Sequence, residues 1–130
     1  MLWSLVIFAC QPSASVPLPD PGPPAAERVE ALSEELTVAL ALWRAARYPE
    51  AQQTVQGAYA DHFEPLEPAL SADDPAGTLA LEYAFGRLVW QLRRGGNTSE
   101  VSDAVTALTA SVTEAVADAG LTKEQAGAGR

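Results

Sequence analysis

The chain has 130 residues, of which 48% are hydrophobic and 19% charged, enough for one globular domain with a core. It carries 17 acidic and 8 basic residues, a net charge of −9. This balance argues against nucleic acid, whose phosphates require a basic surface, and against binding acidic lipid by net charge. The single Cys excludes an internal disulfide and Cys-rich metal motifs, and the single His argues against a His-based zinc site or a catalytic triad.

The first nine residues are uncharged and mostly apolar, but too few to cross a bilayer as a helix. They end with the small residue Ala9, directly before the only Cys, Cys10, and small residues before a cleavage point are typical of signal peptides. The order Ile-Phe-Ala-Cys resembles the bacterial lipobox, in which the Cys is acylated and becomes the new N-terminus. It implies a signal peptide over residues 1–9 and lipidation of Cys10. The alternative is a buried Cys on an apolar strand.

Residues 10–26 follow as a Pro-rich linker, with six of the ten prolines between positions 11 and 26. Such a segment is extended and cannot pack a core. A signal, a Cys and a spacer predict a domain tethered to a membrane at the periplasmic face of the bacterial envelope. The residue after the Cys is Gln11 and not Asp. Because an Asp at this position would resemble an inner-membrane retention signal, an outer-membrane lipoprotein is favoured.

Four helices are predicted, and prolines mark the boundaries of the first two. The first is expected over residues 25–48, where apolar residues recur at steps of three and four before Pro49. The second begins near Pro49, a favoured residue in a first turn. Pro65 and Pro68 break or kink it near Glu64.

The last two predicted helices carry capping signals. The third follows the acidic segment 71–74 and ends at Arg94 before two glycines, and the fourth follows the segment 97–100 and ends near Ala119. We therefore predict a helical domain over residues 27–119 and a disordered tail over 120–130. Short connections favour antiparallel neighbours, so the fold class is all-α: an antiparallel up-down four-helix bundle after a disordered N-terminal tether.

Apolar periodicity indicates which side chains form the core. The third helix presents one apolar seam, which further residues widen, and the aromatic residues of the second and third helices are expected to be buried. The seam is Leu81, Phe85, Leu88 and Leu92, widened by Leu79, Tyr83 and Trp90; the aromatic core is Tyr59, Phe63, Phe85 and Trp90.

The acidic residues are concentrated where the basic residues are missing. Between Tyr48 and Gly86 there are seven acids and no Lys or Arg. Like charges repel unless a cation or a distant base intervenes. Asp61 and Glu64 are three residues apart and share a helix face, with His62 adjacent to them. The simpler interpretation is a solvated acidic face and an ordinary surface or packing histidine.

Oxygen ligands with one imidazole suit hard or intermediate cations, including iron. Helical bundles build metal sites from carboxylates on facing helices, and Glu82 on the third helix could supply the facing group. From spacing alone, Glu82 is either exposed or buried with a partner. The candidate metal ligands are Asp61, His62, Glu64, Glu67 and Glu82.

The segments AYADHFEPLEPAL (58–70), LEYAFGRL (81–88) and LRRGG (92–96) resemble the soluble extracytoplasmic domain of bacterial high-affinity iron permeases. In that family a helical domain with the pattern Tyr-x-Asp-x-Phe-Glu-x-x-Glu precedes a multi-span membrane part. The resemblance covers about residues 36–116 and implies iron binding. It puts Asp61, Glu64 and Glu67 on the family's acidic positions, with Tyr59 and Glu82 as weaker correspondences.

The permease's transmembrane helices, with their Arg-Glu-x-x-Glu motifs, do not occur in this sequence. We therefore expect a stand-alone, lipid-anchored domain that binds iron and assists a membrane iron permease as its partner. The alternative is a structural or interaction module that binds no metal. An enzyme is not expected, because no Ser-His-Asp arrangement, Gly-rich phosphate loop or Glu-x-x-His motif occurs.

Overall fold

A computed structural model describes residues 22–122, and all the regular structure in this range is helical. The expected signal peptide, the lipidation site Cys10 and most of the linker lie outside the described residues. The elements in chain order are α1 (Ala25–Arg44), α2 (Tyr48–Ala58), the π-helix η1 (Tyr59–Phe63), the 3₁₀ turn η2 (Glu64–Leu66), α3 (Glu67–Asp73), α4 (Pro75–Arg94) and α5 (Thr98–Asp118).

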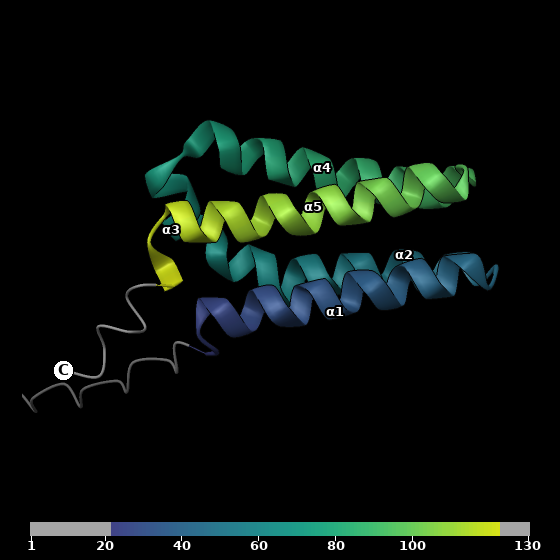
Figure 1. The fold of residues 1–130 in the computed structure, drawn as a ribbon, viewed down its shortest axis with the longest axis horizontal. Coiled ribbons are helices and arrows are strands. Elements are labelled where there is room, and N and C mark those ends of the chain that lie inside the picture. Colours follow the sequence, from purple (N-terminus) through teal and green to yellow (C-terminus); the bar gives the residue numbers. More distant parts are fainter. Residues whose placement is uncertain (1–21, 123–130) are drawn as a thin grey trace, which may run out of the picture.

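The long helices lie side by side as a bundle (Figure 1). Helix α1 packs against α2 and α5, while α4 packs against α2 and α5 from the other side. The short helix α3 packs against α4, and η1 contacts both α1 and α2. The predicted all-α class and helical bundle are therefore confirmed.

The connection between α1 and α2 differs from the prediction. Helix α1 ends at Arg44 rather than at residue 48, because Ala46 adopts a positive φ of 61°. The amide of Arg47 then donates to the carbonyl of Leu42 at 2.9 Å and closes the turn. Pro49 does not stop α1; it lies in the first turn of α2, where its missing N–H leaves no helical bond unmade.

The ends of α4 and α5 follow the predicted capping signals. The Asp74 carboxylate accepts a hydrogen bond of 2.9 Å from the amide of Gly77, and Gly95 ends α4 with a φ of 73°. The Asn97 side chain accepts from the amide of Ser99 at 2.8 Å and caps α5. These local contacts fix where both helices begin and where α4 ends.

The core is formed by the facing apolar stripes of the four long helices, together with Phe63, Leu66 and Leu70 from the segment between α2 and α4. The predicted seam of α4 is buried, and so is the predicted stripe of α5. These side chains are Leu81, Phe85, Leu88 and Leu92 on α4, and Val101, Val105, Leu108, Val112 and Val116 on α5.

The three residues predicted to widen the seam of α4 are not buried, and one of them, Trp90, was also expected in the aromatic core. Tyr83 and Trp90 are 65% and 54% exposed, and Leu79 is 46% exposed. Residues 81, 85, 88 and 92 occupy the buried side of α4, and at 3.6 residues per turn positions 79, 83 and 90 fall on the opposite side. The expectation that these three side chains widen the seam is therefore wrong.

The edges of the helical domain differ by a few residues from the expected ones. Helix α1 begins at Ala25, within the expected linker, and Leu121, within the expected tail, packs against the core. No helix within residues 22–122 has both the length and the apolar content needed to cross a membrane.

Candidate functional site

The chain changes its winding between α2 and α3. After Ala58 it winds as a π-helix, in which the amide of Glu64 bonds to the carbonyl of Tyr59 five residues earlier. Pro65 accounts for the change, because it has no N–H to offer the carbonyl of Asp61 and its ring clashes with a carbonyl four residues before it. Short π-helical segments are rare and are frequent at functional sites.

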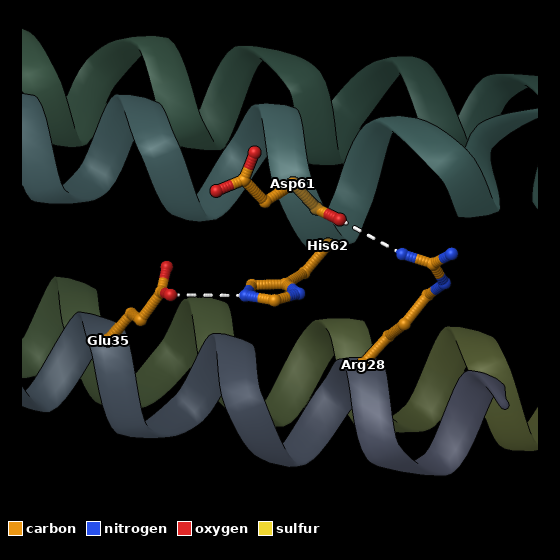
Figure 2. Close-up of polar contacts among 4 residues, drawn as sticks. All are labelled: Arg28, Glu35, Asp61 and His62. Carbon is orange, nitrogen blue, oxygen red and sulfur yellow. Dashed lines mark hydrogen bonds and ion pairs between the residues drawn. The ribbon is translucent and has the colours of Figure 1, made fainter. Parts of the chain in front are cut away.

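Arg28 of α1 provides the donor that Pro65 lacks. Its Nη1 donates to the backbone carbonyl oxygen of Asp61 at 2.9 Å. Figure 2 shows the Asp61 carboxylate directed away from Arg28, so the guanidinium meets the main chain rather than the acidic group. Asp61 itself is exposed.

His62 also contacts α1. Its Nε2 lies 3.1 Å from Oε1 of Glu35, and both side chains extend into the space between η1 and α1 (Figure 2). The His62 side chain is 19% exposed and that of Glu35 is 39% exposed. Sequence analysis did not indicate Glu35, since it is 27 positions away on another helix and no pattern links the two.

Tyr59 is positioned by aromatic packing. Its ring centroid lies 5.4 Å from that of Phe63 and 5.2 Å from that of Phe85, and the last two lie 5.0 Å apart. Phe63 and Phe85 are buried and join η1 to α4. The ring of Tyr59 is thereby held, and its hydroxyl donates a hydrogen bond to Oε1 of Glu67 on α3.

Carboxylates from three elements act on the Tyr59 hydroxyl. Its hydrogen bond to Glu67 raises the pKa of Tyr59 far above the usual value, and burial and the negative charges of Glu67, Glu82 and Glu64 raise it further. These glutamates belong to η2, α3 and α4. We call Tyr59, Glu64, Glu67 and Glu82 the Tyr59 centre.

A small pocket of about 240 Å³ adjoins the Tyr59 centre between α2 and α4. Tyr59 and Glu82 line it together with Phe85 and Gly86, and its other walls are Val55, Gln56 and Val89. Because most of these side chains are apolar, charges beside the pocket are less well screened than charges on an open surface.

The structure thus separates the five predicted metal ligands. Glu64, Glu67 and Glu82 act on Tyr59, whereas Asp61 and His62 lie on the stretch of η1 that contacts α1. Within residues 22–122 no group of three or more His, Cys, Asp or Glu side chains is arranged to hold a metal ion. The Tyr59 centre is therefore a hydrogen-bonded pair of Tyr59 and Glu67 that also feels the negative charges of Glu64 and Glu82, and not a finished coordination shell.

Two other acids of the base-free interval have structural roles. Glu50 forms an ion pair with Arg47, just outside the interval, and Asp74 caps α4.

Comparisons with protein-family models, curated proteins and solved structures find no match for this chain.

Proposed function

We propose that this chain is an accessory domain of the bacterial envelope that binds iron as its cargo at the Tyr59 centre and assists a membrane iron permease. The observation that supports the proposal is the hydrogen bond from the Tyr59 hydroxyl to Glu67, together with the negative charges of Glu82 and Glu64, which also raise the pKa of Tyr59. Carboxylate oxygens suit hard and intermediate cations, and placing them on separate helical elements is how bundles build such sites.

Cation binding at this centre requires side-chain movement. Glu64 is exposed, and Glu67 and Glu82 are half-buried; on this proposal their carboxylates turn toward a common ion from positions that, within residues 22–122, form no metal-ligating group. A bound cation replaces the repulsion among the three carboxylates by attraction. It also competes with the phenol proton for Glu67.

The proposal assigns the metal to a narrower set than the five residues expected from sequence. Asp61 and His62 are left out, because the Asp61 segment contacts Arg28 and His62 contacts Glu35. We retain from the sequence the antiparallel up-down order of the helices, the lipid anchor at Cys10 and the outer-membrane location.

Iron titration of the purified full chain by calorimetry or equilibrium dialysis tests the proposal. Glu67→Gln and Glu82→Gln are each expected to weaken binding about tenfold or more, a loss of about 1.4 kcal/mol. Asp61→Asn is the matched control, since it removes one charge from a neighbouring position and should leave the affinity unchanged. Absence of iron binding by the wild type, or an equal loss in the control, would overturn the proposal.

The anchor is tested separately. When membranes are washed in high salt, which removes binding by charge, Cys10→Ser is expected to move the protein from the membrane fraction to the soluble fraction of cells, because no acyl chain can then be attached. Immunoblotting of the two fractions measures this. Retention of the variant with membranes, at the level of the wild type, would contradict lipidation at Cys10.

A second candidate function is an interaction module that binds no metal. The observation that favours it is the lack of a group of three metal-ligating side chains arranged for an ion within residues 22–122. On this alternative, Glu64→Gln and Glu67→Gln change neither the metal content of the purified protein nor its capture by a permease. Measuring both quantities in one set of variants separates the two functions.

A further inference from the structure

The outward side of α4 carries large apolar side chains in contact with solvent. Leu79, Tyr83 and Trp90 are exposed, and steps of four and seven residues place them along one line on the helix. The line spans about 16 Å at 1.5 Å per residue. Gly86 lies between the two rings and is also exposed, and nothing lies within 4 Å of where its Cβ would be.

The charges on α4 are opposite in sign to those of the protein as a whole. The helix has three arginines, Arg87, Arg93 and Arg94, and one acid, Glu82, which acts on Tyr59. Within residues 22–122 none of the three arginines forms an ion pair. The Arg94 guanidinium instead lies 4.5 Å from the centre of the Trp90 ring. We call Leu79, Tyr83, Gly86, Arg87, Trp90 and Arg94 the α4 outer face.

We propose that the α4 outer face docks on the surface of a bilayer that contains anionic phospholipid. Trp and Tyr have an apolar ring and a polar tip, and they concentrate at the level of the lipid headgroups. Arginine binds phosphate oxygens in a bidentate manner, and a basic residue near an anionic surface contributes about 1 kcal/mol. Trp90 and Arg94 are neighbours, so both interactions occur at one point of the face.

The distribution of charge determines which face of the protein meets the bilayer. The net charge of −9 opposes binding through most of the surface, whereas α4 carries three arginines and a single acid, Glu82, which lines the same surface hollow as Tyr83 and Trp90. An anionic bilayer therefore repels the other faces and attracts this one. A symmetric dimer through α4 is disfavoured, because α4 has three arginines and one acid, so the two copies would face each other with the same net charge.

Vesicle flotation with the full chain carrying Cys10→Ser, so that no acyl group is attached, tests the proposal. The vesicles are phosphatidylcholine alone or phosphatidylcholine mixed with phosphatidylglycerol. The apolar N-terminal residues contribute without regard to lipid charge, so the readout is the difference between the two vesicles. We expect more protein to float with the anionic vesicles, and added salt to remove the excess.

Matched variants locate the contact. Arg94→Gln is expected to lower the partition onto anionic vesicles about fivefold, from the attraction of about 1 kcal/mol that one basic residue feels. Arg44→Gln is the control, since Arg44 is also exposed and also ends a long helix, and it should have little effect. Trp90→Ala should weaken binding more than Val38→Ala, which removes a similarly exposed apolar side chain from α1.

The proposal is overturned if neutral and anionic vesicles bind equally, or if Arg94→Gln and Arg44→Gln behave alike. It is also overturned if vesicles do not bind while an acidic protein is retained in a manner that depends on Arg94, since the face would then be a protein-docking site. Far-UV circular dichroism of each variant confirms that it is folded. None of these outcomes depends on iron binding at Tyr59.

Discussion

Tyr59 takes part both in the aromatic packing of the core and in the polar contacts of the Tyr59 centre. Its ring is held between Phe63 and Phe85, and its hydroxyl donates to Glu67 among carboxylates. Because these negative charges oppose a phenolate, the folded protein keeps the phenol neutral. The neutral phenol has a proton to donate, and this proton is what holds Glu67 beside it.

The raised pKa of Tyr59 predicts a loss of stability in alkali. The neutral phenol is favoured by the fold, so this contribution is complete below about pH 10, the usual pKa of unfolded tyrosine, and is lost as the pH rises above it. Urea unfolding across this range should show a steeper decline for the wild type than for Tyr59→Phe. Parallel declines would mean that Tyr59 does not titrate differently in the folded state.

Phe63 is expected to be the most sensitive residue of the site. It is completely buried, so Phe63→Ala should lower the free energy of unfolding by about 3–5 kcal/mol. Tyr83→Ala removes an aromatic ring that is 65% exposed and should change stability by less than about 0.5 kcal/mol. Chemical denaturation measures both values. Similar losses would contradict the burial difference.

The acidic segment was predictable from the sequence. Which of its side chains lie near Tyr59 and which lie near α1 was not. Asp61 and Glu64 are three apart and were expected to share a face, which holds for an α-helix and fails where the winding becomes π-helical. Contacts with Arg28 and Glu35 depend on where α1 packs, which local spacing does not specify. Tyr59 became central only once Glu67 and Glu82 were placed around it.

At the scale of elements, side-chain caps determine where α4 and α5 begin and a left-handed glycine ends α4, and these are the boundaries that were predicted best. The end of α1 is set instead by Ala46 in a left-handed conformation, and alanine gives no signal for it. The outer side of α4 was mistaken for core because apolar residues occur on both of its sides. Composition does not tell which side meets the bundle.

The cap of α4 is tested by two substitutions at one position. Asp74→Ala should lower the free energy of unfolding by about 0.5–2 kcal/mol, because the amide of Gly77 loses its acceptor. Asp74→Asn retains an acceptor oxygen and should cost much less. Thermal unfolding followed by circular dichroism measures both. Equal losses would show that the charge of Asp74, and not its hydrogen bond, supports α4.

At the scale of the whole molecule, the excess of acidic residues is balanced by few ion pairs. Residues 22–122 contain two close acid–base contacts, Arg47 with Glu50 and His62 with Glu35. A net charge of −9 therefore leaves a folded surface whose charges mainly repel one another.

This repulsion predicts that salt stabilises the protein. Raising the concentration of sodium chloride shortens the screening length, which weakens repulsion more than the two contacts. The melting temperature should rise by a few degrees, as a gain of about 1 kcal/mol produces in a domain of this size. A falling melting temperature would show that attractive pairs dominate the surface.

The π-helical turn from Tyr59 to Phe63 contains one residue more than a turn of α-helix would. Loss of a residue elsewhere within α2 would rotate everything after it by about 100° and take Phe63 out of the core. Loss of Ala60 would instead remove the extra residue of the π-helix and leave the apolar side chains before and after it facing inward, although Pro65 would still lack the N–H that an α-helix needs at that position. Insertion or deletion of one residue at this turn can therefore rearrange its polar groups while the core packing of the other helices stays the same.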